Sequence, residues 1–476
     1  MKVLLISPCS DPDVVTPKGL MIPQLSLHIL QGLTPQEHEV KLVEEENEPL
    51  NLEEECDLVG ISCMTSNAPR AYQLAQEFKK RGKTVVFGGV HPTILPEEAL
   101  QYGDSVVAGE AEGVWEQVLV DFQNGGLQRK YHNPKPPLDK YIPKKYGKHH
   151  QKKLFHVIPL MTTRGCPYSC EFCCVSDLYG KQIRHSPVSN VIRDIEDSGG
   201  KSFIFLDDNI IGKPAYAKEL FEAMKPLKIR WAGQASVSFV HDIDLMKMAA
   251  DSGCTALFFG VESVSEVQLK TMRKSIKELD KIEEAIQMVK DLGIVFHASM
   301  VFGFDSDTKG VFPDTLEFLQ RNKVSSASLN ILTPYPGTRI YEQFKREGRL
   351  ITTNWKYYDH STVTYKPKNM SPDELQAGMI WVKREFSKLS SILRRLPGNL
   401  SHPVLFLSMN LGQRKMATID TMRLPILVPE VSEAHLDVSA IERARAAKSG
   451  LNQKQLRREG MRLLKQMLGG ERAEAM

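Results

Sequence analysis

Residues 162–174 read Thr162-Thr163-Arg164-Gly165-Cys166-Pro167-Tyr168-Ser169-Cys170-Glu171-Phe172-Cys173-Cys174. This run places three thiols, Cys166, Cys170 and Cys173, in a CxxxCxxC arrangement within eight residues. Thiolates bind soft metals, and several of them in one tight loop are the usual ligands of an iron–sulfur cluster. A cubic four-iron cluster normally takes four cysteines, so three of them leave one iron open to a small molecule. The spacing therefore indicates catalysis rather than electron transfer alone.

The alternative interpretation is a structural zinc loop in which Cys174 or a nearby histidine supplies the fourth ligand. Structural zinc usually takes two separated pairs of ligands, one of them a CxxC pair. The sequence contains no second CxxC pair and no HxxxH pair. An open iron–sulfur cluster is therefore favoured, and Cys174 is interpreted as a spare small residue.

The CxxxCxΦC pattern, with the aromatic Phe172 before its last cysteine, resembles the signature of the radical S-adenosylmethionine (radical SAM) enzymes. The resemblance implies that Cys166, Cys170 and Cys173 hold a 4Fe-4S cluster and that the amine and carboxylate of SAM chelate the open iron. Reductive cleavage of SAM then gives a 5′-deoxyadenosyl radical.

Composition is that of an ordinary globular protein. The chain has 476 residues, 42% apolar and 25% charged, and this length accommodates two or three domains. There is no run of 18 apolar residues, and the start Met1–Pro8 is too short for a signal peptide, so we expect a first strand there. A net charge of +3 argues against a general nucleic-acid binder. Eight cysteines, three of them clustered, suit a reducing cytoplasm and, because an exposed cluster is oxygen-sensitive, an anaerobic or microaerobic host.

Residues 1–125 alternate short apolar runs with helical patterns, as in a parallel α/β sheet. The expected strands are Lys2–Ser7, Glu39–Val43, Leu58–Cys63, Thr84–Phe87 and Ser105–Ala108, and the expected helices are Pro23–Leu33, Ala68–Arg81 and Glu112–Asn124. Ligands of such sheets bind at the carboxyl ends of the strands. The loops there are Pro8–Ser10, Met64-Thr65-Ser66-Asn67, Gly88–Thr93 and Gly109–Glu112. No GxGxxG follows the first strand, so dinucleotide binding has little support.

The GGxHPT and GExE loops resemble those of the cobalamin-binding domain that precedes many radical SAM cores. The resemblance implies that Met64, Thr65, Ser66 and Asn67 lie below or beside the corrin. It assigns Gly88, Gly89, His91, Gly109 and Glu110 to the same site. Gly88 and Gly89 lack a Cβ, so a large planar group is expected to approach the backbone there. The loop after the first strand, Pro8 to Gly19, has no histidine for cobalt, which leaves the lower ligand open. The alternative is a flavodoxin-like regulatory domain without cofactor, in which His91 and Glu110 cap helices.

Residues 126–155 are rich in Lys, Pro, His and Tyr without apolar periodicity, and we predict an exposed linker. Its Lys/His run at 144–153 is interpreted as solvated, with a binding patch as the alternative. The βα alternation then resumes. The expected strands are Val157–Thr162, Ser202–Leu206, Ile229–Ala232, Ala256–Gly260, Val295–Phe302 and Ser326–Ile331. Six such units resemble the partial (β/α)6 barrel of the superfamily, whose catalytic groups lie at the strand carboxyl ends.

Polar segments follow these strands in the family's order. Asp207 and Asp208 follow the second strand and are expected to meet the ammonium group of SAM, unless one of them is a helix N-cap. Gln234 follows the third strand as a partner for ribose or carboxylate. Glu262 and Ser263 resemble the family's G-[IV]-E-S segment near the ribose or the methionine carboxylate. Val301 belongs to the apolar segment Met300–Phe304 expected along the adenine, although a core strand has the same composition.

The carboxyl-terminal part offers fewer signals. Thr333–Thr338 resembles a P-x-P-G-T loop of cobalamin-dependent members, so Tyr335 is expected near the active site, facing substrate or simply packing. Ser371 and Pro372 start a helix whose apolar stripe over 374–394 is typical of a core. Residues 433–476, with Arg443, Arg445, Arg457, Arg458 and Arg462, are expected to form a charged helical tail, solvated by default or else a docking surface.

We therefore predict an α/β protein with a Rossmann-like cobalamin-binding domain (1–125), a linker (126–155), a radical SAM core (156–350) and a mostly helical domain (351–476). The resemblance implies a cobalamin-dependent radical SAM methyltransferase that moves a methyl group from SAM through methylcobalamin to an unactivated sp3 carbon. Its first alternative is a cyclase or oxidase with the same cofactors, and its second is a non-catalytic cobalamin sensor with a zinc loop. The substrate stays open among small molecules, lipids, tetrapyrroles and peptide or protein residues. A ferredoxin or flavodoxin is expected as reductant, with no nucleic acid, no transmembrane segment and a cytoplasmic location.

Overall fold

The computed structural model describes residues 1–10, 22–133, 135–144, 146, 157–271, 278–432 and 452–468, with side chains omitted for 426–432 and 468. The chain divides into two compact units. The first comprises residues 1–167, 174–234 and 354–356, and the second comprises residues 168–173, 235–353 and 357–476. The predicted run 433–451, with Arg443 and Arg445, lies outside the described residues, as do 147–156 of the predicted linker and 11–19 of the loop after the first strand.

The first unit begins with a six-stranded parallel sheet in the order β2-β1-β3-β4-β5-β6. Its strands are β1 (Lys2–Ser7), β2 (Glu39–Glu44), β3 (Leu58–Ser62), β4 (Thr84–Gly88), β5 (Ser105–Gly109) and β6 (Lys130–Asn133). Its helices are α1 (Leu25–Leu33), η1 (Thr65–Asn67), α2 (Ala68–Lys80), α3 (Val90–Ile94), α4 (Pro96–Ala99) and α5 (Trp115–Gln123). The five predicted strands and three predicted helices are confirmed to within three residues at each end.

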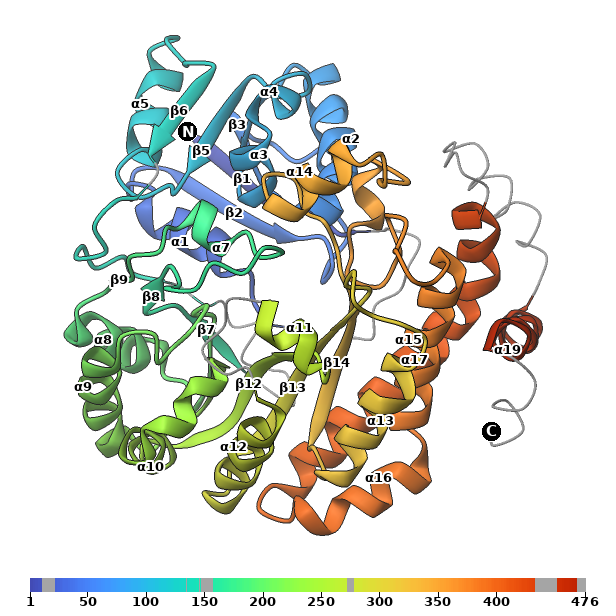
Figure 1. The fold of residues 1–476 in the computed structure, drawn as a ribbon. Coiled ribbons are helices and arrows are strands. Elements are labelled where there is room, and N and C mark those ends of the chain that lie inside the picture. Colours follow the sequence, from blue (N-terminus) through green and yellow to red (C-terminus); the bar gives the residue numbers. More distant parts are fainter. Residues whose placement is uncertain are drawn as a thin grey trace. The chain divides into compact units, whose positions relative to one another are not determined.

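Helices cover both faces of this sheet, because its strands are apolar on both sides. On one face Val3, Leu5 and Leu58 form a buried core with Leu27 of α1 and Trp115 of α5. Helix α2 packs on the other face against β3 and β4, and α5 and α2 are drawn on either side of the sheet in Figure 1. The sheet thus leaves its strand ends for loops that can carry function.

Two parts of this sheet differ from the sequence prediction. Strand β6 lies within the stretch predicted to be an exposed linker, and it pairs in parallel with β5 from Val106↔Lys130 to Gly109↔Asn133. Helix α3 lies in what was predicted to be a loop after β4, and α4 follows it in residues for which no element was predicted. The domain boundaries at 125, 155 and 350 stay a prediction.

The radical SAM-like segment contributes six further parallel strands. In the first unit β7 (Ile158–Leu160) pairs with β10 (Ser202–Phe205), and β10 pairs with β11 (Arg230–Ala235). The two-residue strands β8 (Thr163–Arg164) and β9 (Arg184–His185) pair antiparallel. Helices here are α7 (Val175–Leu178), α8 (Val188–Ser198), α9 (Pro214–Met224) and η2 (Lys225–Leu227).

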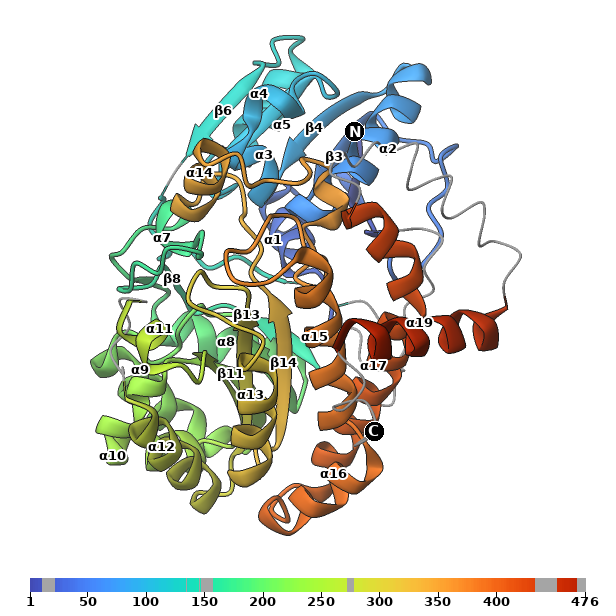
Figure 2. The same cartoon turned by 45° about the vertical axis from the view of Figure 1, so that its right-hand side comes forward.

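In the second unit β12 (Cys254–Glu262), β13 (Val295–Phe302) and β14 (Ser326–Ile331) pair in parallel in that order. All six predicted strands of this segment are present. The second unit's helices are η3 (Val237–His241), α10 (Ile243–Asp251), α11 (Glu266–Thr271), α12 (Leu279–Asp291), α13 (Val311–Arg321), α14 (Arg339–Arg346), α15 (Pro372–Phe386), α16 (Leu389–Arg395), η5 (Leu396–Gly398), α17 (Pro403–Ser432) and α19 (Gln453–Leu468). The short helix η4 (Trp355–Tyr357) spans the point in the chain where the first unit ends, at residue 356, and the second resumes. Figure 2 shows α13, α15, α16 and α17 of the helical part.

The start of α15 is as predicted from the sequence. The Ser371 hydroxyl accepts a hydrogen bond from the Glu374 N–H at 3.2 Å, and the Glu374 carboxylate accepts one from the Ser371 N–H at 2.8 Å. This reciprocal pair is a capping box, with Pro372 at the first helical position. The stripe that follows is core along α15, since Leu375, Met379 and Val382 are buried, whereas Leu389, in its continuation on α16, is 54% exposed.

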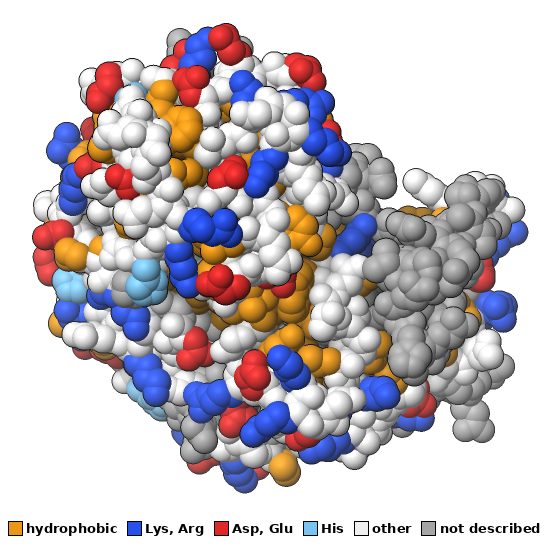
Figure 3. All heavy atoms as spheres, turned by 90° about the horizontal axis from the view of Figure 1, so that it is seen from above, with side chains coloured by type: hydrophobic (Ala, Val, Ile, Leu, Met, Phe, Trp, Pro, Cys, Tyr) orange, Lys and Arg blue, Asp and Glu red, His pale blue; other side chains and the backbone are white. Residues whose placement is uncertain are grey.

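Two further expectations concern a nucleic-acid-binding surface and a transmembrane segment. On the face drawn in Figure 3, Lys and Arg side chains are interspersed with Asp and Glu, without one large area of a single sign. Within the described part of the chain, no helix is both long enough and apolar enough to cross a bilayer.

Candidate active site

The loop that carries the first cluster cysteine is fixed by its backbone. Gly165 has φ +99°, and a Cβ there would lie 2.9 Å from the carbonyl oxygens of Gln182 and Gly180. A side chain at this position is therefore excluded both by conformation and by space. The N–H of Cys166 donates to the Gly180 carbonyl at 3.3 Å, which holds the half-buried cysteine beside the β8–β9 pair.

The other two cysteines belong to the second unit. The Cys173 N–H donates to the Cys170 carbonyl at 3.2 Å, and both side chains are half-buried. Phe172 between them contacts Phe304, which follows β13, with ring centroids 5.8 Å apart. The aromatic residue of the motif thus packs against the segment predicted to lie along the adenine.

The donor chemistry of the loop fits an iron–sulfur cluster. Cys166, Cys170 and Cys173 form no disulfides and are partly accessible, as soft metal ligands must be. Burial raises the pKa of the neighbouring Cys174 thiol, which disfavours the thiolate that a metal needs. In the described residues no group of three or more His, Cys, Asp or Glu is already gathered around a metal-sized point. The assignment therefore depends on the identity and spacing of the thiols.

Asp207 is fully buried and serves the loop itself. Its Oδ1 accepts hydrogen bonds from the Thr162 hydroxyl at 2.7 Å, the Thr163 N–H at 2.5 Å and the Thr163 hydroxyl at 2.6 Å. The predicted alternative of a helix N-cap is therefore wrong for Asp207, because its acceptors are used by residues that precede it by more than forty positions. It fixes the strand end from which the cysteine loop departs.

Asp208 is the carboxyl group of this pair that stays available. Burial and the adjacent Asp207 raise the pKa of Asp208 to about 6, while the Gly165 N–H opposes that shift by donating to it. Such a group at a strand end is a good partner for a cation that replaces water around it.

The next two strands carry the remaining predicted SAM residues. Gln234 lies within β11 rather than after it, with an exposed side chain, and its carbonyl accepts the Ile210 N–H at 2.9 Å. Glu262 ends β12 after an irregularity between Gly260 and Glu262, and it has φ +70° although it is not glycine. Non-glycine residues in this conformation are uncommon and concentrate at functional sites.

Three predicted residues in the second unit have defined surroundings. Ser263 is buried, and its hydroxyl accepts the Ser265 N–H at 3.1 Å. Val301 is half-buried in β13. The Tyr335 hydroxyl lies 2.9 Å from the Tyr358 carbonyl and 3.0 Å from His360 Nε2. Tyr335 was expected either to face substrate or to pack against the protein, and these contacts favour packing.

The first unit holds all residues predicted for cobalamin. Met64 is 55% exposed, whereas Thr65 is buried, and Thr65, Ser66 and Asn67 form η1 at the end of β3. Asn67 links two strand-end loops, since its Oδ1 accepts the Met64 N–H at 2.8 Å and its Nδ2 donates to the Pro8 carbonyl at 2.9 Å. The loops after β1 and β3 are thereby tied together.

The side of Gly89 that lacks a Cβ faces another protein loop. The residue has φ +97°, and a Cβ would lie 2.6 Å from the Cys63 carbonyl oxygen and 2.9 Å from the Cys63 nitrogen. The glycine is needed for this close approach of two protein loops, and its contribution to cobalamin binding stays a prediction. A Cβ on Gly88 would have no neighbour nearer than 4.0 Å, so space exists only there.

His91 is completely buried and both of its ring nitrogens have protein partners. Nε2 lies 3.2 Å from the Glu98 carboxylate and Nδ1 lies 3.4 Å from the Thr65 hydroxyl. The same carboxylate accepts hydrogen bonds from the Trp355 indole at 2.9 Å and from the Tyr72 hydroxyl at 3.0 Å. His91 therefore belongs to a polar cluster that converges on Glu98, and its contribution to cobalamin binding stays a prediction.

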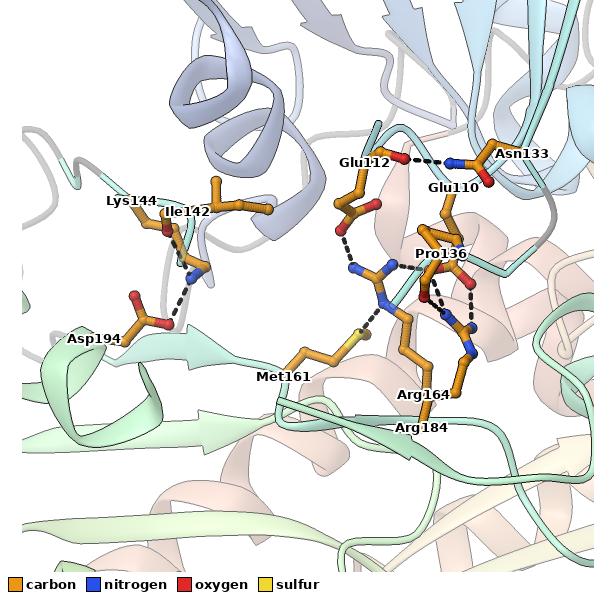
Figure 4. Close-up of polar contacts among 10 residues, drawn as sticks. All are labelled: Glu110, Glu112, Asn133, Pro136, Ile142, Lys144, Met161, Arg164, Arg184 and Asp194. Carbon is orange, nitrogen blue, oxygen red and sulfur yellow. Dashed lines mark hydrogen bonds and ion pairs between the residues drawn. The ribbon is translucent and has the colours of Figure 1, made fainter. Parts of the chain in front are cut away.

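The loop after β5 carries a charge network that sequence reasoning missed. Gly109 has φ +101° and its N–H donates to the Thr93 hydroxyl at 3.0 Å. The next residue, Glu110, forms ion pairs with both Arg164 and Arg184, and Glu112 pairs with Arg164 (Figure 4). Their side chains are at most 17% exposed, so two cations and two anions are buried together. Arg164 stands two residues before Cys166, and the network therefore joins the predicted cobalamin loop to the start of the cluster loop.

Lys144, the first residue of the run predicted to be solvated, is instead packed against the protein, and most of that run lies outside the described residues. Lys144 donates to Asp194 at 2.5 Å and to the Ile142 carbonyl at 3.1 Å (Figure 4), and its side chain is only 13% exposed. A Cβ on Gly32 of α1 would lie 2.2 Å from the Pro143 carbonyl, so this segment packs directly on the helix. Between α1, residues 135–144 and Met161 lies a cavity of about 510 Å³, which none of the predicted cobalamin residues lines.

Comparison with known proteins agrees with these observations. A family model described as a B12 binding domain matches residues 15–119, and one described as the radical SAM superfamily matches residues 160–319. Bacteriochlorophyllide d C-12(1)-methyltransferase of Chlorobaculum tepidum is 31% identical over 430 residues, which cover 87% of this chain and 94% of that protein. Bacteriochlorophyllide d C-8(2)-methyltransferase of the same organism is 31% identical over 372 residues, covering 73% of this chain and 82% of that one.

Among solved structures, that of the radical SAM methyltransferase TsrM from Kitasatospora setae, with cobalamin and a 4Fe-4S cluster bound, has the same fold. The TM-score is 0.64 at 14% identity, with 87% of this chain and 99% of that chain covered.

Proposed function

Since the chain belongs to the cobalamin-dependent radical SAM methyltransferases, we propose that its substrate is a tetrapyrrole and that it methylates a saturated carbon in a side chain of the macrocycle. The observation that carries this proposal is the 31% identity to a bacteriochlorophyllide methyltransferase over 94% of that protein's length. A second relative with the same class of substrate supports it.

The family assignment resolves the alternatives drawn from the sequence. The two relatives at 31% identity are both named methyltransferases, which disfavours a cyclase or oxidase without methyl transfer. A match to the radical SAM superfamily that includes all three cysteines disfavours a zinc-loop sensor. The cofactors of this enzyme are a 4Fe-4S cluster, SAM and cobalamin.

We assign roles to this chain's own residues as follows. Cys166, Cys170 and Cys173 hold the cluster, and the Asp208 carboxylate faces the ammonium group of SAM. Asp207 accepts buried hydrogen bonds from Thr162 and Thr163 and thereby fixes the start of β8, the strand that leads into the cysteine loop. Together the bound cofactors supply a hydrogen-abstracting radical and a transferable methyl group, and the protein positions both and excludes water.

Two further parts of the proposal concern the surroundings of the enzyme. Cleavage of SAM requires one electron, so a ferredoxin or flavodoxin is proposed as the partner that delivers it. A cytoplasmic location is proposed because the cluster needs a reducing compartment.

The test is anaerobic reconstitution with iron, sulfide and hydroxocobalamin, followed by reductant, SAM carrying a trideuterated methyl group, and bacteriochlorophyllide d. The expected products are 5′-deoxyadenosine, S-adenosylhomocysteine and a macrocycle that has gained one trideuteromethyl group by mass spectrometry. The Cys173→Ala variant is expected to lose iron and both SAM-derived products, whereas the matched Cys174→Ala variant keeps them.

Two results would overturn parts of this proposal separately. Formation of both SAM-derived products with no label in any of a panel of tetrapyrroles would refute the substrate class. A protein with full iron, sulfide and cobalamin content that produces neither product would refute the proposed reaction.

A further inference from the structure

An apolar and cationic surface lies on two consecutive helices of the second unit, α16 and the start of α17. The sequence from Phe386 to Ile419 contains five Lys or Arg and no Asp or Glu. Large apolar side chains are exposed along the same stretch, namely Leu389, Leu393, Leu400, Val404, Leu407 and Leu411. We call these six residues, together with Arg394 and Lys415, the α16–α17 surface.

On α16 the apolar side chains occur on both faces. Ile392 and Arg395 are buried against the rest of the unit, and the Arg395 guanidinium donates to the Val324 carbonyl at 2.8 Å and to Asn410 Oδ1 at 2.7 Å. Leu389 and Leu393, four residues apart, share one side of the helix and are 54% and 63% exposed. The core of the unit therefore uses one side of the helix, and the two leucines stay in solvent.

Helix α17 repeats this division. Phe406 and Ala417 are buried on one side. Val404, Leu407 and Leu411 follow at spacings of three and four, so they form a single stripe, in which Val404 is 71% exposed. Soluble proteins rarely expose contiguous apolar surface of this kind unless it binds something.

The charges bordering the stripe are positive. Lys415 is exposed and stands one helical turn after Leu411, on the same side, and Arg394 is exposed beside Leu393. Within the described part of the chain neither of them forms an ion pair with a carboxylate. This differs from the face of the molecule in Figure 3, where positive and negative side chains are mixed.

We propose that the α16–α17 surface docks the enzyme onto an anionic lipid bilayer, with both helices in the plane of the interface. Apolar side chains inserted beside the headgroups, flanked by Lys and Arg, are the usual composition of a helix that lies on a membrane. Neither helix can span the bilayer, since no helix among the described residues is long and apolar enough. A second copy of the chain fits this surface poorly, because a symmetric contact would bring the same cations together without a carboxylate.

Vesicle flotation of the anaerobic holoenzyme tests the proposal directly. Vesicles of phosphatidylcholine with one third phosphatidylglycerol are compared with vesicles of phosphatidylcholine alone. The enzyme is expected to float with the anionic vesicles and to bind the neutral ones at least about tenfold more weakly. The double variant Leu393→Glu/Leu407→Glu is expected to lower the partition coefficient at least about tenfold, because it removes apolar area and adds repulsion.

Matched variants separate this surface from a general effect. Val267, on α11, is 66% exposed, and Val267→Glu is expected to leave flotation unchanged. Lys415→Glu is expected to weaken binding, whereas the exposed Lys201→Glu is not. Equal flotation of wild type and the double leucine variant, or no flotation of wild type, would overturn the proposal.

Light scattering without lipid tests whether a second copy of the chain binds to the α16–α17 surface instead. A concentration-dependent dimer that disappears in the Leu393→Glu/Leu407→Glu variant would assign the surface to a second copy and also overturn the proposal. SAM cleavage is expected to be unchanged in these variants, since none of the altered residues belongs to the proposed active site. Failure of docking thus leaves the proposed function untouched.

Discussion

Replacement of Arg164 by methionine tests whether the buried charge network holds the cluster loop. Arg164 pairs with both Glu110 and Glu112, whereas Arg184 pairs with Glu110 alone and also donates to the Pro136 carbonyl at 2.6 Å. Without Arg164, Glu110 keeps Arg184, but Glu112 loses its only ion-pair partner among the described residues. The variant therefore contains one uncompensated buried carboxylate.

Breaking a buried pair in this way costs about 3–5 kcal/mol of unfolding free energy. Spread over a unit of this size, that cost lowers the midpoint of thermal unfolding by roughly 6–20 °C. Arg184→Met is the matched control, and its loss is expected to be smaller because Glu110 still has Arg164. The double variant Arg164→Met/Glu112→Gln removes the stranded charge and is expected to be more stable than Arg164→Met by about 1–3 kcal/mol.

The assay is thermal unfolding of the anaerobic holoenzyme at a fixed scan rate, followed by circular dichroism. Iron and cobalamin content measured on the same samples shows whether the loss of stability reaches the cofactor loops. A midpoint for Arg164→Met that is no lower than that of Arg184→Met would refute the reasoning. A double variant less stable than Arg164→Met alone would refute it as well.

The pH dependence of the same variants gives an independent check with a fixed sign. Although burial opposes it, Arg164 holds the pKa of Glu112 below its ordinary value of 4.5. The stability that this ionised carboxylate contributes is therefore complete above about pH 4.5 and is lost as the pH falls further, through its folded-state pKa. In Arg164→Met the lowering effect of Arg164 is gone, so burial shifts the pKa of Glu112 upward against the weaker opposing effects of a backbone hydrogen bond and of Arg184. The stability difference between wild type and the variant is thus expected to be largest near neutral pH and to shrink on acidification.

Three further predictions concern single positions. Gly89→Ala is expected to lower the free energy of unfolding, measured by urea titration, by more than about 2 kcal/mol. The reason is that φ +97° with ψ −171° is a glycine-only conformation and that the new Cβ would overlap a backbone carbonyl. The control Gly82→Ala, at φ +71° in open space, should cost about 1 kcal/mol in the same titration. Burial raises the pKa of Asp307 to about 6, so folding favours its protonated form. The free energy of unfolding of the wild type should therefore fall as the pH rises from about 4 to 6. Asp307→Asn should lack this slope in urea titrations across the same pH range. Asp208→Asn is expected to raise the KM for SAM about tenfold or more with iron content unchanged, measured from 5′-deoxyadenosine formation; an unaltered KM would exclude its contact with the SAM ammonium group.

The strands were predictable because each is a short apolar run buried on one or both faces. Strand β6 was not predicted, because its sequence, Lys130-Tyr131-His132-Asn133, has a single buried side chain, Tyr131. This strand is held mainly by backbone pairing with β5. The same limit applies to β8 and β9, which are two residues each. A periodicity cannot be read from so few side chains.

Site residues were predictable where the chemistry is local to the motif. Three thiols within eight residues specify a cluster loop without knowledge of anything else in the chain. Asp207 shows the opposite case: ligand binding and helix capping both seemed open to it, yet its carboxylate accepts from Thr162 and Thr163, 45 and 44 residues earlier. No spacing rule connects positions so far apart.

Glu110 combines both situations. Its loop resembles the cobalamin-binding pattern, which assigned Glu110 to the cofactor site, but the structure shows both carboxylate oxygens occupied by guanidinium groups 54 and 74 residues later in the chain. The side chain cannot serve a ligand without first breaking a buried ion pair, which costs more than a typical hydrogen bond returns. What this loop can offer a corrin is therefore its backbone, shaped by Gly109, and the position in which the two arginines hold it. If so, Glu110→Gln, which weakens both ion pairs without changing the shape of the side chain, should lower cobalamin retention and the midpoint of thermal unfolding together. A loss of cobalamin at unchanged stability would instead return the carboxylate to the cofactor.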